Sequence, residues 1–378
     1  MQIVELYLRH FRCINEAKAS FCPSVNLIVG ANGMGKSSLL EALSLVTANQ
    51  SFRTKWLADA VQTGQKGFLA KAKILFGDLL FDIEISYLNN KKSILINGRP
   101  FDEESSFFGR LAAVIIPPNV HELIQGAPPW RRHFLDSLLS QIDPLYCHHL
   151  SRYFKGLRQR NWLLKKKDFK LCPCFERELS KAGAYIIERR RHTVKRLKVF
   201  VLDAFQSLYD PSSERDIDVE YQTEAPKTDS IEELADYLAT ELGRRRAQEA
   251  TLGATLVGPH RDDLEMMIGG QAARRTSSQG EARLGSIALK LAQGRLIAEE
   301  TGELPALLVD DFCAFLDDTK AYRLFQQLKG FGQLFLTKQS PFGYDGGESY
   351  TFEMVNGKIQ SPKAMEPNAV TQKQLLPA

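Results

Sequence analysis

The stretch GANGMGKSS, residues 30–38, restricts the fold more than any other part of the chain. It matches the phosphate-loop pattern G-x-x-x-x-G-K-[ST], although so few fixed positions also occur by chance in flexible turns. Its flanks favour the phosphate loop: VNLIVG is a short apolar strand, and KSSLLEALSLV has apolar residues at helical spacing. Strand, glycine loop and helix therefore predict an α/β nucleotide-binding domain, with a plain strand-to-helix turn as the alternative.

The residue types in this loop suit a nucleoside triphosphate with Mg²⁺. Backbone N–H groups of the loop and the positive end of the following helix bind phosphate oxygens. We expect Lys36 to neutralise the β- and γ-phosphates and to assist hydrolysis, and the Ser37 hydroxyl to coordinate Mg²⁺. The predicted nucleotide contacts are Gly30, Ala31, Asn32, Gly33, Met34, Gly35, Lys36, Ser37 and Ser38.

A later acidic pair supplies the second half of such a site. In PALLVDD, residues 305–311, an apolar strand ends at Val309 and Asp310 follows at its carboxyl end, where open α/β sheets bind ligands. We expect Asp310 to hold Mg²⁺ and Asp311 to polarise the attacking water. The alternative is that the two acids only cap the next element.

A third segment, SSQGEARLGSIALKLAQ at residues 277–293, begins with small residues and continues as a helix. Ser278 and the amides around Gly280 therefore lie at a helix start, which is an anion-binding position. Because the chain already has a phosphate loop, we expect Ser278 and Gly280 to contact the γ-phosphate bound by a second copy. ATP would then join two copies in a twofold dimer. A serine-capped core helix is the alternative.

The periodicity of apolar residues changes along the chain and predicts its domains. Residues 1–119 read as the first part of an ATPase head, with a mixed sheet and an antiparallel meander between residues 71 and 97. Residues 120–251 carry apolar residues at helical spacing and predict an inserted all-helical lobe. Residues 252–360 return to α/β signals as the second part of the head, and residues 361–378 lack any period, as in a mobile tail.

Charge is distributed unevenly over the 378 residues. Between residues 152 and 198 there are sixteen Lys or Arg and four acids, a net charge of +12; the whole chain is +4, so the remainder carries −8. This polarity predicts a polyanion partner, DNA, for the helical lobe, although a solvated helix face is the alternative. The candidate DNA contacts are Arg158, Arg160, Lys165, Lys166, Arg189, Arg190 and Arg191.

Several classes of protein fit the sequence poorly. No apolar run approaches the ~20 residues that span a bilayer, and the N-terminus lacks the basic-then-apolar order of a signal peptide, so a cytoplasmic protein is expected. The six cysteines are scattered along a long chain, which favours reduced thiols. A zinc site built from YCHH and CPC is an alternative that lacks the usual ligand spacing.

The motifs together resemble the RecF family among the ATP-binding-cassette (ABC) heads of DNA-repair and chromosome-maintenance ATPases. The resemblance spans residues 6–317 and is carried by LRHFRCI, GANGMGKSSLLEAL, SFRT, RRHFLDSLLSQIDPLY, LRQRNWLLK, GPHRDDL, SSQGEARLGSIALKLAQ and LLVDDFCAFLD. It implies an ABC-type head with an inserted lobe, in a recombination mediator that dimerises on ATP and binds DNA at single-strand gaps or junctions. It further implies that RecO and RecR act with this protein to load RecA, and that slow, DNA-stimulated ATP hydrolysis resets the dimer.

The resemblance also implies residue roles. Lys36 and Ser37 resemble the Walker A ligands, Asp310 the Walker B acid and Asp311 the hydrolytic carboxylate. Ser278 and Gly280 resemble the signature that acts in trans, and Asp317 resembles the acid of the D-loop. The His260, Arg261 and Asp262 side chains of GPHRDDL are similar to head residues near the site, with a buried polar network as an equal alternative.

Some positions depart from the family pattern. Pro118 and Asn119 stand where an acidic pair is usual, Phe315 replaces an acid of the D-loop, and KQS after Thr337 leaves that threonine as the switch residue. None of these changes removes a phosphate or Mg²⁺ ligand, so we expect ATP binding to persist and hydrolysis to be slower than is usual in the family. The rival functions are the ATPase subunit of a transporter and a small-molecule P-loop kinase.

Overall fold

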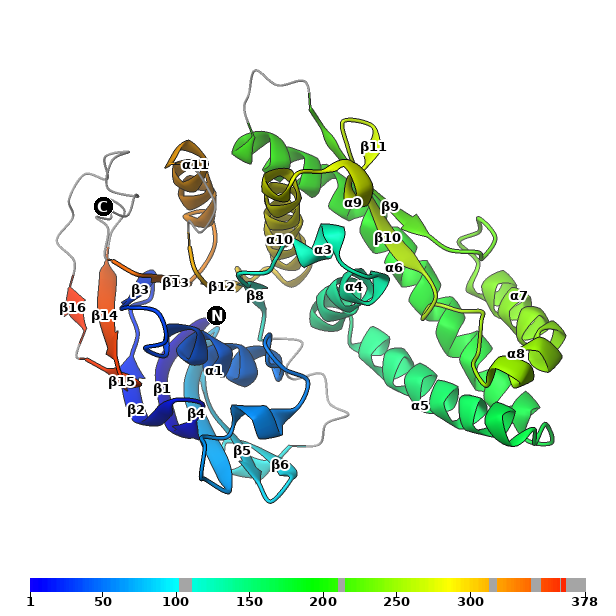
Figure 1. Cartoon of the computed structure of the whole chain (residues 1–378), viewed down its shortest axis with the longest axis horizontal. Coiled ribbons are helices and arrows are strands. Elements are labelled where there is room, and N and C mark those ends of the chain that lie inside the picture. The colour runs from blue at the N-terminus through cyan, green and yellow to red at the C-terminus, as the bar shows by residue number, and fades with distance from the viewer. Residues whose placement is uncertain (102–110, 210–214, 313–317, 341–347, 361, 365–378) are drawn as a thin grey trace. The chain divides into compact units, whose positions relative to one another are not determined.

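The computed structural model describes residues 1–101, 111–209, 215–312, 318–340, 348–360 and 362–364. The chain divides into two units, each described by itself below (Figure 1). The head unit comprises Met1–Val120, Ala204–Ser213 and Ser286–Ala378, and the lobe unit comprises His121–Asp203 and Glu214–Gly285.

An antiparallel sheet forms one layer of the head unit, with the strand order β2-β1-β4-β5-β6-β7. Buried and exposed residues alternate along most of its strands, as expected when one face packs on a core. Asn89, Asn90 and Asn97 adopt positive φ in the tight turns that join the later strands. The predicted meander is therefore confirmed, and β2, which the periodicity did not predict, extends the sheet. The strands are β1 Gln2–Phe11, β2 Ile14–Ser20, β4 Gly67–Phe76, β5 Leu79–Leu88, β6 Lys91–Ile96 and β7 Arg99–Pro100.

The second sheet of the head unit is mainly parallel and has the order β15-β14-β3-β13-β12-β8, with β16 also paired to β14. Strands β14, β3, β13, β12 and β8 run parallel, so their carboxyl ends meet at one edge. All five residues of β3 are buried, as expected for a central strand covered on both faces. The strands are β3 Val25–Val29, β8 Ala113–Ile116, β12 Ala306–Val309, β13 Leu334–Lys338, β14 Ser349–Val355, β15 Lys358–Ile359 and β16 Lys363–Ala364.

Helix α1, Lys36–Ala48, lies between these two sheets and contacts strands of both. Most of its residues are buried, and its leucines join a core cluster with side chains from each sheet. Because α1 begins directly after the loop that follows β3, this burial fixes the glycine loop at the carboxyl edge of the parallel sheet. The other helices with residues in the head unit are η1 Leu57–Ala60, α6 Cys172–Leu208, α10 Gln279–Thr301 and α11 Asp318–Leu328; α6 and α10 also have residues in the lobe unit.

The lobe unit contains a small sheet as well as helices, so the prediction of an all-helical lobe is wrong. Three antiparallel strands have the order β11-β10-β9, and β9 and β10 bury alternate residues. The segment IDVEYQ is only six residues long and pairs with a strand some 40 residues further on, so its local sequence carries little signal. The elements are α3 Glu122–Gln125, α4 Pro128–Ile142, α5 Pro144–Lys166, β9 Ile217–Gln222, α7 Ile231–Arg244, α8 Arg246–Leu252, β10 Asp263–Ile268, β11 Gln271–Ala272 and α9 Ala273–Thr276.

The lobe unit also extends further along the chain than the predicted boundary at residue 251. Strand β10 pairs with β9, and Arg131 of α4 binds Asp263 through two hydrogen bonds of 2.8 and 2.7 Å. These pairings place the segment from residue 252 to Gly285 with the lobe rather than with the head. Most of the predicted tail, like Phe315 and Asp317, lies outside the described residues. Among the described helices, none combines the length and apolar character needed to cross a bilayer.

Candidate nucleotide site and nucleic-acid surface

The loop between β3 and α1 has a backbone that requires glycine. Gly30 has a φ of 146°, and a Cβ atom there would lie 2.5 Å from the carbonyl oxygen of Met354. Gly33 and Gly35 adopt φ values of 80° and 107°, in the region that side-chain-bearing residues rarely occupy. The loop therefore turns tightly at the N-terminus of α1, where backbone amides and the helix dipole favour an anion.

Lys36 places its ammonium inside this loop. Its Nζ donates to the carbonyl oxygens of Gly30 at 2.6 Å and Ala31 at 2.9 Å. Burial lowers the pKa of Lys36, whereas the carboxylates of Asp311 and Asp310 raise it. A buried ammonium with two carbonyl partners is stabilised by an anion close by, so the loop and its lysine together suit a phosphate group.

Three oxygen-bearing side chains meet at the carboxyl edge of the parallel sheet. Asp310 follows β12 and is buried, and its Oδ1 accepts hydrogen bonds from Ser37 Oγ at 3.0 Å and Thr337 Oγ1 at 2.7 Å. The backbone N–H of Asp311 donates to the same threonine oxygen at 2.7 Å. Thr337 therefore joins the two neighbouring acids to the end of β13, and Ser37 joins them to the start of α1.

These residues fit a magnesium–triphosphate ligand. Burial raises the pKa of Asp310, and its hydrogen bonds with Thr337 and Ser37 lower it. Mg²⁺ prefers oxygen ligands and retains several waters, so one hydroxyl and one carboxylate are sufficient protein ligands when phosphates supply the rest. The described residues contain no cluster of three or more His, Cys, Asp or Glu that would hold a metal without such help.

Asp311 combines an unusual backbone with a carboxylate beside the loop. Its φ is 55°, which is uncommon for a residue with a side chain. The hydrogen bond from its N–H to Thr337 holds this conformation, and its charge acts on Lys36. Strained backbone of this kind is found at functional sites, which makes Asp311 a candidate for positioning water.

Two further residues at this edge were missed by the sequence analysis. Gln339 follows β13; its Nε2 donates to Asn32 Oδ1 at 3.3 Å, and its carbonyl oxygen accepts from Gly30 N at 3.3 Å. Arg53 lowers the pKa of Asp310 through its charge and is anchored by the buried Glu41 at 3.5 Å. Nothing local in the sequence predicted this role of Gln339, because it depends on the pairing of β13 with β3.

In the lobe unit, Ser278 and Glu281 form a reciprocal cap at the start of α10. Ser278 Oγ accepts from the N–H of Glu281 at 3.2 Å, and Glu281 Oε2 accepts from the N–H and the hydroxyl of Ser278, both at 3.0 Å. Arg215 forms an ion pair with the other oxygen of Glu281. A Cβ atom on Gly280 would approach only Ser278 Oγ, at 4.0 Å, so packing within the chain does not require glycine there.

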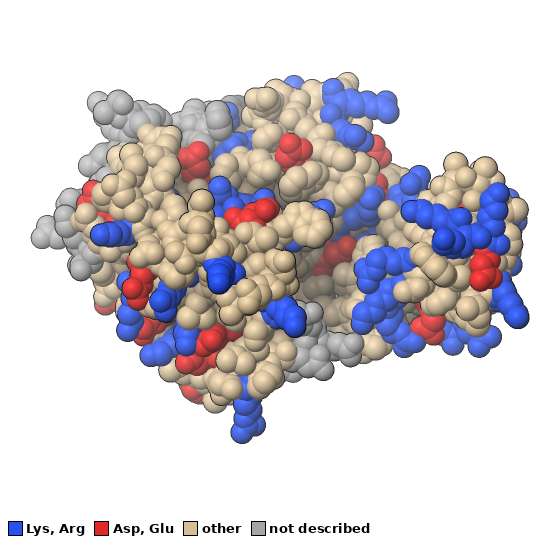
Figure 2. Space-filling model, turned by 60° about the horizontal axis from the view of Figure 1, so that its bottom comes forward, with Lys and Arg blue, Asp and Glu red and all other residues tan. Residues whose placement is uncertain are grey.

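The predicted DNA contacts fall into three groups in the structure: exposed, partly exposed and buried. Arg158, Lys165 and Lys166 are exposed on α5, and Figure 2 shows Lys and Arg side chains crowded over the lobe unit with few acids among them. Arg189 and Arg191 are only partly exposed. The first binds Asp143 at 2.9 Å, and the second donates to backbone carbonyl oxygens of residues 225 and 228.

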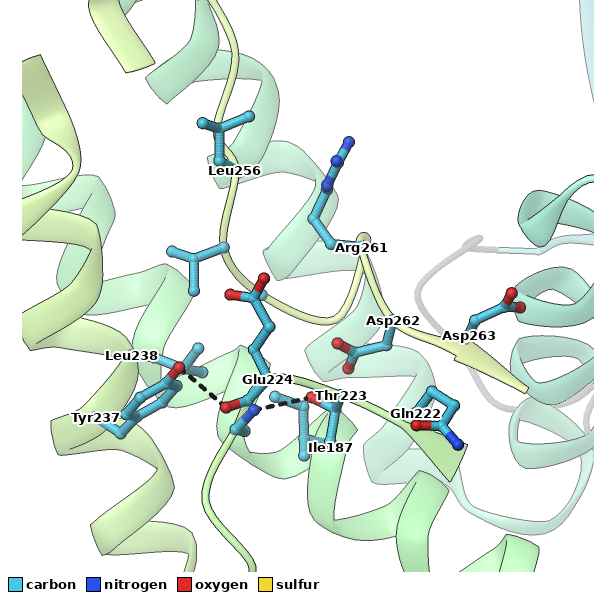
Figure 3. Close-up of a pocket in the computed structure, with 13 residues that line it drawn as sticks. Ile187, Gln222, Thr223, Glu224, Tyr237, Leu238, Leu256, Arg261, Asp262 and Asp263 are labelled. Carbon is cyan, nitrogen blue, oxygen red and sulfur yellow. Dashed lines mark hydrogen bonds between the residues drawn. The ribbon is translucent and has the colours of Figure 1, made fainter. Parts of the chain in front are cut away.

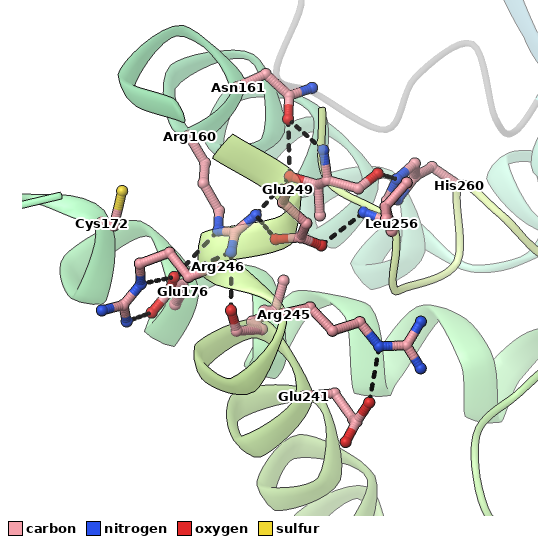
Figure 4. Close-up of polar contacts among 12 residues, drawn as sticks. Arg160, Asn161, Cys172, Glu176, Glu241, Arg245, Arg246, Glu249, Leu256 and His260 are labelled. Atoms are coloured by element: carbon pink, nitrogen blue, oxygen red, sulfur yellow. Dashed lines mark hydrogen bonds and ion pairs between the residues drawn. The ribbon is translucent and has the colours of Figure 1, made fainter. Parts of the chain in front are cut away.

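Arg160 and Arg190 are buried, and the prediction that they contact DNA is corrected. Arg160 is fully enclosed by two glutamates, Glu176 at 3.1 Å and Glu249 at 2.6 Å (Figure 4). Arg190 pairs with Asp136 at 2.6 Å and is 1 % exposed. A phosphate would have to break these internal pairs, which makes both arginines structural residues of the lobe unit.

The residues of GPHRDDL belong to the lobe unit, where two of the three form a buried network. His260 shares a hydrogen bond of 2.6 Å with Tyr153, its Nε2 lies 2.9 Å from Thr255 O, and burial lowers its pKa to about 4. Asp262 accepts a hydrogen bond from Tyr221. This arrangement favours the alternative of a structural network over a place in the head.

Arg261, by contrast, is exposed at the edge of a cavity of about 380 Å³ in the lobe unit. Figure 3 shows its guanidinium pointing away from the carboxylates of Asp262 and Asp263. The cavity is lined mainly by polar groups and carboxylates, so it does not resemble the phosphate loop of the head unit. The cavity-lining residues are Ile187, Gln222, Thr223, Glu224, Ala225, Tyr237, Leu238, Leu256, Val257, Gly258, Arg261, Asp262 and Asp263.

Known proteins are similar to this chain over most of its length. Residues 2–339 match the model of the RecF/RecN/SMC N-terminal domain. The chain is 36 % identical over 343 residues to the DNA replication and repair protein RecF of Protochlamydia amoebophila, covering 90 % of this chain and 95 % of that protein. It is 34 % identical over 343 residues to the RecF of Symbiobacterium thermophilum, covering 89 % and 91 %.

Solved structures are also similar to this chain over most of its length. A structure of the recombination mediator protein RecF-ATP in the RecFOR pathway is similar with a TM-score of 0.86 and 30 % identity, covering 96 % of this chain and 97 % of that one. An Smc head bound to the C-winged helix domain of ScpA is similar in fold, with a TM-score of 0.56 and 16 % identity over 97 % of this chain and 98 % of that one. The predicted ABC-type head is therefore confirmed.

Proposed function

The chain belongs to the RecF family of DNA replication and repair proteins, within the RecF/RecN/SMC N-terminal-domain family, and from this membership we propose that it is an ATP-gated DNA-binding mediator of recombinational repair. Two copies dimerise on ATP and bind DNA at single-strand gaps or junctions. Together with RecO and RecR they help to load RecA. Slow, DNA-stimulated hydrolysis of ATP to ADP and phosphate then resets the dimer.

The observation that carries this proposal is the arrangement at the edge of the parallel sheet. Lys36 and the loop amides suit the β- and γ-phosphates, and Ser37 with Asp310 suits Mg²⁺, because all of them meet where β3, β12 and β13 end. When bound, the Mg²⁺ ion neutralises charge on the triphosphate. Asp311 orients a water for attack, and Thr337 holds both acids in place.

The proposed dimer rests on the start of α10. Ser278 has a hydroxyl and an N–H at a helix N-terminus; in the single chain both donate to Glu281, and a γ-phosphate would take the place of that carboxylate. Nothing within the chain requires glycine at 280. We assign these groups to the γ-phosphate held by a second copy, so that each nucleotide lies between two chains. In this arrangement a twofold dimer contains two ATP molecules.

The DNA surface lies on the lobe unit. The exposed cations Arg158, Lys165 and Lys166 suit phosphate contacts, which give an affinity that depends on salt and not on base sequence. Arg189 and Arg191 on α6 are already engaged within the lobe, by Asp143 and by backbone carbonyl oxygens, so they are weaker candidates for phosphate contacts.

Sedimentation with and without ATP and Mg²⁺ tests the proposal. The wild-type chain should become a dimer with the nucleotide, and Lys36→Ala and Ser278→Arg should both remain monomers. A small-molecule kinase would stay monomeric in every case, and a transporter subunit would not show DNA binding that weakens at rising salt. An unchanged mass in all samples would reject the ATP-gated dimer.

A further inference from the structure

Near its C-terminal end, helix α5 carries an exposed indole between cations. Arg158, Trp162, Lys165 and Lys166 follow one another at helical spacings of three and four, so they share one face of the helix. All four are exposed, and Trp162 exposes 56 % of its surface. The opposite face, which includes Leu163 and Leu164, is buried, so packing of α5 does not account for an outward tryptophan.

The cations of this face are not committed to partners. Within the part of the chain that the structure describes, the side chains of Arg158, Lys165 and Lys166 make no hydrogen bond or ion pair, whereas Arg160 on the buried face is enclosed by acids. Three positive charges without internal neutralisation are expected to attract a polyanion.

The same end of the helix gathers other exposed apolar groups. Phe169, in the turn between α5 and α6, is 39 % exposed, and Leu252, at the end of α8, is 61 % exposed. The end of α8 lies beside α5. Directly after α8, Gly253 packs against the stem of Lys165, and the N–H of Thr255 donates to Asn161 Oδ1 at 2.8 Å. We call the surface formed by Arg158, Trp162, Lys165, Lys166, Phe169 and Leu252 the α5 tip.

The chemistry of the α5 tip separates its candidate ligands. Duplex DNA offers phosphates but keeps its bases stacked, so it would use the cations and leave the indole without a role. Single-stranded nucleic acid offers both phosphates and unstacked bases, and aromatic side chains among cations are the usual platform for it. A membrane surface would need a broader apolar face than one indole and a few neighbouring side chains.

We propose that the α5 tip binds single-stranded nucleic acid, with Trp162 stacked on a base and Arg158, Lys165 and Lys166 paired with the flanking phosphates. The proposal rests on the proposed DNA-binding function and extends it, because it assigns recognition of the single-stranded side of a gap to a particular surface. The residues from 158 to 166 span about 12 Å along the helix axis, so the contact covers only a few nucleotides.

Trp162→Ala tests the stacking, with Trp56→Ala as a matched control because Trp56 is also exposed, at 75 %, but lies in the head unit. Binding of the full-length chain to labelled oligo-dT and to a duplex of equal length should be measured by fluorescence anisotropy with ATP and Mg²⁺. Trp162→Ala should weaken oligo-dT binding at least about fivefold and leave duplex binding unchanged. Trp56→Ala should change neither.

A spectroscopic readout is available because the chain contains only three tryptophans. In a Trp56→Phe/Trp130→Phe variant, the emission of Trp162 should be quenched by oligo-dT and not by the duplex. Wild-type oligo-dT affinity in Trp162→Ala, an equal loss for both nucleic acids, or a response of Trp162 to anionic vesicles alone would each overturn the inference. Those outcomes leave the ATP-gated dimer standing; a wild-type chain that binds neither nucleic acid would instead refute the proposed function.

Discussion

Replacing Arg160 by methionine is expected to destabilise the lobe unit strongly. The guanidinium donates to Glu176 at 3.2 and 3.1 Å, to Thr255 Oγ1 at 2.8 Å and to the carbonyl oxygen of Leu242 at 2.9 Å, and it forms an ion pair of 2.6 Å with Glu249 (Figure 4). Methionine keeps much of the apolar stem and removes all of these interactions.

The loss of unfolding free energy depends on which glutamate is left without a positively charged partner. Glu176 keeps Arg246, whose Nε donates to it at 2.9 Å, but Glu249 is fully buried and keeps only the N–H of Leu256 at 2.6 Å. An uncompensated buried charge of this kind costs about 3–5 kcal/mol. That is a large part of the ~5–15 kcal/mol by which a folded domain is usually stable.

Urea unfolding followed by far-ultraviolet circular dichroism measures this loss. The free energy of unfolding of Arg160→Met should be about 3–5 kcal/mol lower than that of the wild type. The double variant Arg160→Met/Glu249→Leu should recover part of it because no charge is then left buried. Arg158→Met, two residues away and exposed, should change stability by less than about 0.5 kcal/mol and weaken DNA binding. An Arg160→Met variant that is as stable as wild type but binds DNA poorly would refute the structural role.

Three further predictions follow from individual contacts. Thr337→Val removes the hydroxyl that holds Asp310, so ATP turnover should fall about tenfold while a filter assay still detects ATP binding; unchanged turnover would contradict this. Glu281→Gln keeps the cap but removes the negative charge beside Ser278, so ATP-dependent dimers should form about two- to fivefold more tightly in sedimentation, and weaker dimers would count against a γ-phosphate contact there. His260 has a pKa of about 4 when folded and about 6.5 when unfolded, so between these values the unfolded chain binds the extra proton. Stability should therefore fall as pH drops from about 6.5 to 4, by up to about 1.4 kcal/mol per pH unit, and His260→Gln should flatten this slope in urea titrations.

Structure that is determined by neighbouring residues could be predicted from the sequence. The loop from Gly30 to Lys36, its strand and its helix are continuous in the chain, so their order alone predicted the phosphate-loop geometry. Contacts between distant residues could not be read in this way. Residue 30 must be glycine partly because a Cβ atom there would collide with the carbonyl oxygen of Met354. Gln339 reaches Asn32 because β13 pairs with β3.

The wrong prediction that Arg160 and Arg190 contact DNA has a physical cause as well. Counting charges treats each arginine alike, but Arg160 stands three residues after Leu157 and four before Leu164, on the buried stripe of α5. Arg190 likewise stands three residues after Ile187 and four before Val194 on α6. The helical period therefore contained the signal that both side chains point inward, although it could not name the acids that compensate them.

The claim that one copy completes the nucleotide site of another is tested most directly by mixing two variants. In a mixed dimer of Lys36→Ala and Ser278→Arg, one site carries both substitutions and the other carries neither. We predict that each variant alone stays monomeric with ATP and Mg²⁺ and that an equimolar mixture, with one variant fluorescently labelled, sediments in part as a dimer. If each chain completed its own site, every site in the mixture would be damaged, and a mixture that remains monomeric would contradict the account.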